Sequence, residues 1–171
     1  MRTAGILMPI TSLPSPYGVG TLGQCARDFI QFLHRAGQTY WQILPICPTG
    51  YGDSPYQSFS SYAGNPYMID FDDLKKEGLL QEEEYASISW GDNPARVDYS
   101  LLYSHKFSIL RIACSRISGL LSERFQTFCK EQNVWLNDYA LYMSIKDYYD
   151  GQSWQEWPET LQKREKDSLE A

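Results

Sequence analysis

The chain has 171 residues, of which 43% are apolar, and a formal net charge of -6. This length and composition allow a sizeable core but are too polar for insertion into a membrane, so a soluble globular chain is expected. Lysine and arginine are dispersed along the sequence, and no basic patch could follow a phosphate backbone. Nucleic acid is therefore not an expected partner.

The cysteine and histidine spacing argues against a metal site and against a disulfide framework. No C-x-x-C pair occurs, and His34 and His105 stand alone. Four buried, reduced thiols are expected, at Cys25, Cys47, Cys114 and Cys129. The N-terminal apolar run contains Pro9 and precedes no small-residue cleavage site, so it does not read as a signal peptide, and a cytoplasmic location is expected.

The first third of the chain has the pattern of an α/β protein. The apolar runs over residues 4–10 and 39–46 are bounded by turn residues, which is typical of strands buried on both faces. Between them, Thr21 and Gln24 form a T-x-x-Q capping box that opens an amphipathic helix, and Gly37 ends it. A strand, helix and strand of this length predict a right-handed crossover between parallel strands.

From Asp98 onward the pattern is helical. Apolar residues recur at helical spacing over residues 102–121 and again over residues 135–149, before Gly151. Two or three helices without an intervening strand are therefore expected. The charge-rich stretch over residues 75–85 is expected to form a solvated helix and turn.

Gly18, Gly20 and Gly23 spell the dinucleotide fingerprint G-x-G-x-x-G between the predicted strand and helix. In that fingerprint the first glycine follows the strand directly, and an acidic residue ends the second strand. Here seven residues intervene, and the second strand ends in Pro-Ile-Cys-Pro over residues 45–48. A nucleotide-binding α/β protein is thus the least favoured alternative, and the glycines are expected to shape a loop around residues 14–17.

A tyrosine-rich loop, YGDSPYQSFSSYAGNPY over residues 51–67, follows the second predicted strand. Parallel α/β folds bind ligands at the carboxyl ends of their strands, so this position favours a binding role. A sugar offers an apolar face to an aromatic ring and its hydroxyls to carboxylates, amides and hydroxyls. Glycines and prolines would fix the loop. The candidate sugar-binding groups are those of Asp53, Ser54, Tyr56, Gln57 and Asn65.

Structural roles compete with binding in the same loop. Phe59, Tyr62 and Tyr67 are expected to pack the loop against the barrel wall. The carboxylate of Asp53 could likewise cap the turn at Ser54 instead of binding a ligand.

Three long segments resemble the N-terminal part of one enzyme family. They read AGILMPITSLPSPYGVGTLG, YWQILPICPTGYGDSPYQSFSSYAGNPYMID and WLNDYALYMSIKDYYDGQSWQEWP. With them, the chain from Gly5 to Pro158 is similar to the 4-alpha-glucanotransferases, the amylomaltase or disproportionating enzyme family. The string GYGDSPYQS followed by GNPY carries the resemblance most specifically.

The resemblance implies a (β/α)8 TIM barrel with helical insertions and a place in cytoplasmic maltodextrin metabolism. It implies retaining transfer of an α-1,4-glucan segment from a donor to an acceptor, with α-1,4-glucans as partners and no metal or cofactor. The start of the barrel, with its first two strands and the substrate-binding loop 47–67, would occupy residues 1–73. A mainly α-helical insertion subdomain would occupy residues 74–171.

The resemblance also implies roles for individual residues. Ser54 and Tyr56 match positions that line the donor side of the active cleft, and Asp53 lies beside them. Tyr51 and Tyr99 match positions associated with a second glucan-binding groove. The catalytic carboxylates of the family lie on later barrel strands, so the resemblance places none in this chain.

Length conflicts with a closed barrel, which takes about 250 residues even without insertions. Only two barrel strands are present here, so the barrel is expected to be incomplete and the chain to be an N-terminal portion without activity of its own. The alternative to a portion of an enzyme is a noncatalytic glucan-binding module.

Overall fold

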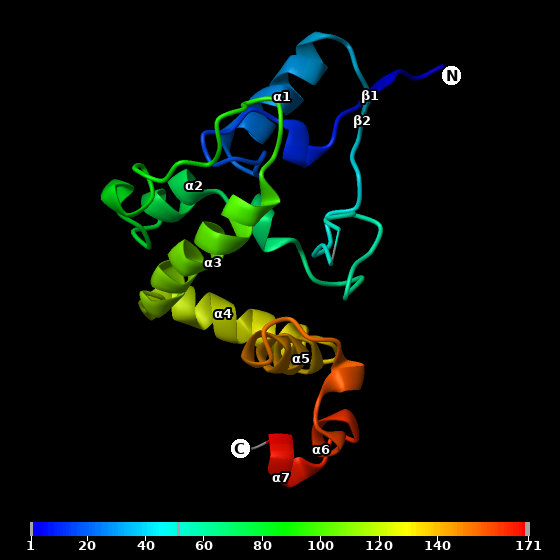
Figure 1. Ribbon diagram of the computed structural model, residues 1–171. Coiled ribbons are helices and arrows are strands. Elements are labelled where there is room, and N and C mark those ends of the chain that lie inside the picture. Colours follow the sequence, from blue (N-terminus) through cyan, green and yellow to red (C-terminus); the bar gives the residue numbers. More distant parts are fainter. Residues whose placement is uncertain (1, 51, 170–171) are drawn as a thin grey trace. The chain divides into compact units, whose positions relative to one another are not determined.

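The computed structural model describes residues 2–50 and 52–169. Its contacts divide the chain into two units, residues 1–123 and 124–171, and each unit is described by itself. The helices and strands are β1 (Gly5–Leu7), α1 (Gln24–Arg35), β2 (Tyr40–Gln42), α2 (Phe71–Lys76), α3 (Tyr99–Ser115), α4 (Gly119–Glu131), α5 (Leu136–Tyr148), α6 (Glu159–Gln162) and α7 (Lys166–Leu169) (Figure 1). The predicted boundary between the start of the barrel, residues 1–73, and the helical subdomain, residues 74–171, stays a prediction.

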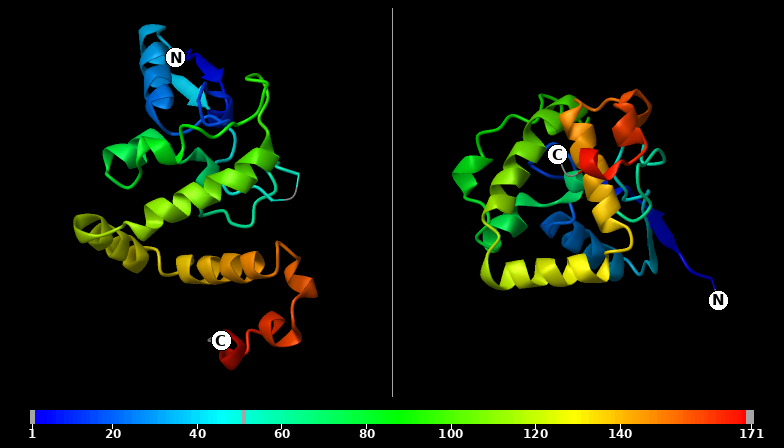
Figure 2. Two further views of the ribbon diagram at one scale, coloured as in Figure 1. Left: turned by 60° about the vertical axis from the view of Figure 1, so that its left-hand side comes forward. Right: turned by 90° about the horizontal axis from the view of Figure 1, so that it is seen from below.

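Strands β1 and β2 pair in parallel, as the sequence predicts, with Gly5 opposite Tyr40 and Leu7 opposite Gln42. Helix α1 connects them, and it lies beside the strand pair in both Figure 1 and Figure 2. The strands are shorter than the apolar runs, because each run contains a proline that cannot donate to a ladder. The fold is therefore mixed α/β, with a two-stranded parallel sheet.

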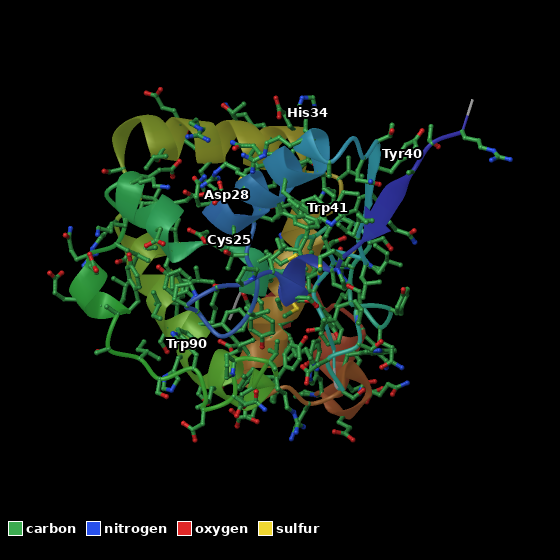
Figure 3. The ribbon with its side chains drawn as sticks, turned by 90° about the horizontal axis from the view of Figure 1, so that it is seen from above. Cys25, Asp28, His34, Tyr40, Trp41 and Trp90 are labelled. Carbon is green, nitrogen blue, oxygen red and sulfur yellow. The ribbon has the colours of Figure 1, made fainter. Side chains whose placement is uncertain are left out.

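The predicted burial of both strand faces is wrong for this chain. Ile6, Leu7 and Tyr40 are 38%, 57% and 61% exposed, and Tyr40 is labelled beside Trp41 in Figure 3. Trp41 alone turns inward, where its ring lies 5.0 Å from that of Phe29 on α1. Within the described residues each strand has one neighbour, so much of the apolar sheet surface lies open.

Helix α1 ends as predicted, since Gly37 takes a φ of +67° just after it, but its start differs. The residue before the helix is Gly23, and no side chain caps the helix there. Thr21, expected to cap it, instead donates its hydroxyl to Oδ2 of Asp70 at 2.5 Å. A capping threonine accepts from a backbone amide, whereas here the hydroxyl is oriented as a donor to a carboxylate, a strong charge-assisted hydrogen bond, and Gly23 occupies the capping position.

Packing explains the three glycines of the G-x-G-x-x-G string. A Cβ on Gly20 would lie 1.9 Å from the carbonyl oxygen of Ile10, and one on Gly23 would lie 2.0 Å from Oδ2 of Asp70. Gly18 has a φ of +74° and lies against Trp90, which Figure 3 labels. The string thus allows the loop to approach its neighbours closely, as the sequence predicts.

One core cluster of the first unit centres on three aromatic rings packed with aliphatic side chains. The rings of Tyr17, Phe71 and Tyr85 lie 5.0 to 5.5 Å from one another, and Phe71 is completely buried. In the second unit, Trp157 is buried with its ring 5.4 Å from that of Tyr142. No strand separates α3, α4 and α5 among the described residues, as predicted.

All four cysteines are free thiols in the structure. Their predicted burial is wrong: Cys114 is exposed, and Cys25, Cys47 and Cys129 are partly buried. Cys114 lies in the last turn of α3, one residue past the buried Ala113, so the helical period turns it outward.

Gly20→Ala is expected to destabilise the chain by about 1–3 kcal/mol, because the new Cβ collides with backbone atoms that cannot move aside. Urea denaturation followed by tryptophan fluorescence measures the change. Gly64→Ala is the matched control, since no atom lies within 4 Å of a Cβ there. Equal midpoints for the two variants would contradict the packing account.

Candidate functional site

The chain leaves the carboxyl end of β2 at Gln42, continues through the tyrosine loop and enters η2 (Pro66–Met68), a 3-10 turn. At the base of the loop the Asn65 amide donates to the Ile46 carbonyl at 2.7 Å. Inside it, the Gly50 amide donates to the Gln57 carbonyl at 3.0 Å, so the tip also closes on itself. A loop whose ends meet and whose backbone is internally bonded is a compact platform for side chains.

Asp53 holds an unusual backbone conformation at the tip. Its φ is +56°, in the left-handed region that aspartate and asparagine tolerate better than most residues, and its amide donates to the Gly50 carbonyl at 3.2 Å. The side chain is half-buried. Its negative charge contributes, after burial, to raising the pKa of both Tyr67 and Tyr99.

Ser54 and Tyr56 form a second feature of the tip. The Tyr56 amide donates to Oγ of Ser54 at 3.3 Å, a serine turn that constrains the backbone at the tyrosine. The Tyr56 side chain is 72% exposed. An exposed aromatic ring does not stabilise a fold by burial, so Tyr56 does not serve mainly to pack the loop.

Tyr67, at the end of the loop, packs against Tyr99 on α3. Asp98 starts α3 by accepting the Leu101 amide at 3.2 Å, which makes Tyr99 the first helical residue. Its ring centroid lies 6.2 Å from that of Tyr67, which is buried. Burial is the main cause that raises the pKa of Tyr67 to about 12, followed by the charge of Asp53.

The charge of Asp53 thus acts on both Tyr67 and Tyr99, whose rings contact each other, and Ser54 and Tyr56 lie within three residues of Asp53 on the same tip. Tyr51 lies outside the described residues. Gln57 is exposed on the tip, and Asn65 is buried, where its Oδ1 accepts the Tyr67 amide at 2.9 Å.

The predicted packing roles divide. Tyr67 is buried, which confirms its role. Tyr62 is 74% exposed and Phe59 40% exposed, so their predicted burial is wrong in this chain. The loop is closed by backbone hydrogen bonds within it, so its conformation does not depend on burial of these two rings.

Sequence analysis missed Lys106, which lies completely buried on α3. Its helical spacing from Leu102 and Ile109 places it on the apolar face of α3, and this spacing in the sequence indicates a buried amine.

Among the residues that the structure describes, no group of three or more histidine, cysteine, aspartate or glutamate side chains could hold a metal ion. No helix in the same ranges is long and apolar enough to cross a membrane.

Known proteins share both the sequence and the fold. A Thermus thermophilus 4-alpha-glucanotransferase is 48% identical over 98% of this chain, which covers 33% of that relative. The Clostridium butyricum 4-alpha-glucanotransferase is 43% identical over 95% of this chain and 34% of its own length. The structure of Streptococcus agalactiae amylomaltase in complex with acarbose matches 99% of this chain and 35% of its own, at 39% identity, with a TM-score of 0.95.

These matches define an α/β segment shared with amylomaltases. The family model described as 4-alpha-glucanotransferase matches residues 8–171, and the chain belongs to this family. It spans about a third of the length of the relatives that it matches.

Asp53→Asn is expected to lower the pKa of Tyr67 from about 12 toward the ordinary value. An anion near a phenol disfavours the phenolate, so removing the charge allows ionisation at lower pH. Burial, the larger cause, remains and keeps the pKa raised. Asparagine tolerates the same backbone region.

An NMR titration of ring-labelled tyrosines, assigned with Tyr67→Phe, measures this change. Asp92→Asn, at an exposed acid outside the loop, serves as the control. An unaltered Tyr67 titration in Asp53→Asn would remove the carboxylate from the tyrosine pair.

Proposed function

We propose that this chain is the N-terminal portion of a 4-alpha-glucanotransferase and that its tyrosine loop binds the α-1,4-glucan. The observation that carries the proposal is the exposed ring of Tyr56, whose backbone amide is held by Ser54 on a self-closed loop that follows β2. An aromatic plane with adjacent hydroxyl and carboxylate groups matches the two faces of a sugar.

The open sheet supports a place in a (β/α)8 barrel. Two parallel strands joined by a helix are the repeating unit of such a barrel. The exposed Ile6, Leu7 and Tyr40 would be covered once further strands and helices are present.

The proposed reaction is retaining transfer of a glucan segment. A carboxylate nucleophile forms a covalent glycosyl-enzyme, and a carboxylic acid about 5–5.5 Å away protonates the leaving oxygen. The 4-hydroxyl of an acceptor glucan, rather than water, then takes the segment. We assign neither carboxylate to this chain, since no acid here lies in the family's catalytic motifs, and both would lie in the two thirds of the relatives that it does not match.

Two roles follow for the tyrosine loop and its neighbour on α3. Ser54 and Tyr56, with Asp53 beside them, would bind the donor glucan at the active cleft. Tyr51 and Tyr99 would bind the remote part of a long glucan in an accessory groove. The proposed enzyme works in the cytoplasm on maltodextrins and uses no metal or cofactor.

The isolated chain is expected to release no glucose from maltotriose above a blank without protein, because both catalytic carboxylates are missing. A coupled glucose assay measures the release. A glucan that binds the chain without turnover fits both a portion of the enzyme and a binding module, whereas glucose release would overturn the assignment of the carboxylates to later strands.

Tyr56→Ala is expected to lower kcat/KM for maltotriose by roughly 30-fold to 1000-fold. The basis is the loss of stacking and one hydroxyl contact, together worth about 2–4 kcal/mol. The host is a chimera in which this chain replaces the matched third of the Thermus thermophilus relative. Tyr56→Phe keeps the ring and should recover much of the loss.

Tyr62→Ala is the matched control, since Tyr62 is an equally exposed tyrosine of the same loop. Melting temperatures are measured beside kcat/KM for each variant. A Tyr56→Ala chimera with unchanged melting and near-normal kcat/KM would remove Tyr56 from the site.

A further inference from the structure

Lys106 is a completely buried lysine on the inner face of α3. Its Nζ donates to the Ile69 carbonyl at 2.7 Å and lies 4.2 Å from the centroid of the Phe71 ring. Lys106 forms no ion pair within the part of the chain that the structure describes. The carboxylate of Asp70 favours the charged form of the Lys106 amine through its own charge, without an ion pair between them.

Burial of the Lys106 amine costs free energy that packing alone does not require. It lowers the pKa of the amine to about 7, since the charged form loses its hydration, and the charge of Asp70 offsets only part of this effect. An apolar side chain of similar length would fill the same space without that penalty. What lysine adds at this position is a long arm that ends in a hydrogen-bond donor.

The position of Ile69, whose carbonyl accepts the hydrogen bond, indicates what Lys106 does. Ile69 follows directly after η2, two residues beyond Tyr67. On α3, Lys106 lies two turns beyond Tyr99 on the same helical face, with the completely buried Leu102 between them. The hydrogen bond therefore joins the helix that carries Tyr99 to the segment that carries Tyr67.

The other hydrogen bonds of this segment lead elsewhere. The Met68 carbonyl accepts the Leu22 amide at 2.9 Å, and Asp70 accepts the Thr21 hydroxyl. Both partners precede α1, so these bonds hold the segment to the start of the chain and not to α3. The hydrogen bond from Lys106 supplies the polar connection to α3.

We propose that Lys106 is a positioning residue for glucan binding, which holds Tyr99 against Tyr67 and the tip of the tyrosine loop. The inference rests on the proposed function, in which Tyr99 binds the remote part of a long glucan. Without the donor, α3 keeps its apolar contacts but loses its fixed register on η2. Tyr99 then presents its ring to the glucan in more than one position.

The test uses the chimera with the Thermus thermophilus relative and compares Lys106→Met, Lys106→Arg, Tyr99→Ala and Lys76→Met. Lys106→Met keeps the length and removes the donor, Lys106→Arg keeps a donor, and Lys76→Met is the control at an exposed lysine on α2. Turnover of maltotriose and of amylose is measured for each variant, with the size distribution of the amylose products.

Lys106→Met is expected to raise KM for amylose about fivefold, the effect of roughly one net hydrogen bond. It should also shift the amylose product sizes in the same direction as Tyr99→Ala. The kcat on amylose and kcat/KM on maltotriose should stay within about twofold of the parent, since short donors never reach Tyr99. Lys106→Arg should recover part of the change, and Lys76→Met should show none.

Each contrary result overturns the proposal in a recognisable way. A shift with Tyr99→Ala but none with Lys106→Met removes Lys106 while the proposed function stands. No shift with Tyr99→Ala removes the accessory groove and the role of Lys106 together. Equal losses on both substrates for Lys106→Met and Lys106→Arg, or failure of both variants to fold, make Lys106 a residue of general stability.

Discussion

The backbone of residues 65–70 is the constraint on which the first unit depends. Its amide and carbonyl groups, with the Asp70 carboxylate, bond to Ile46, Leu22, Thr21 and Lys106. Buried backbone groups must find partners within the protein, and here the partners come from β2's exit, the start of α1 and α3. One short segment therefore sets the positions of the tyrosine loop, the glycine-rich loop and Tyr99 relative to one another.

The sequence predicts features whose causes are local. Helical spacing of apolar residues indicates α3 and α5, and Gly37 marks the end of α1 because a left-handed residue is needed there. Thr21 shows the limit of such reasoning: its cap pattern is local, but its hydroxyl instead donates to the carboxylate of Asp70, which lies 49 residues away. The exposed strands differ for another reason: under the proposed function, further strands and helices of a barrel would cover them, and local sequence patterns do not show whether such neighbours are present.

The candidate site divides in the same way. The pattern of β2 and the composition of the loop predict that Ser54 and Tyr56 lie at a strand end. The contact of Tyr99 with Tyr67 and the influence of the Asp53 charge on both depend on long-range packing, and no spacing in the sequence indicates them. For Lys106, the helical period of the sequence indicates that the side chain faces inward. Its hydrogen bond to the Ile69 carbonyl is shown only by the structure.

The open sheet has a consequence for how a full-length family member is made. This chain covers about a third of its relatives, so a ribosome that has completed this third has about twice its length still to synthesise. At 5–20 residues per second that takes roughly 20 to 70 s, during which β1 and β2 keep unpaired edges beside the exposed side chains of Ile6 and Leu7. Unpaired strand edges template pairing with other chains. Under the proposed function, the nascent chain would therefore need these edges shielded until the later strands of the barrel emerge.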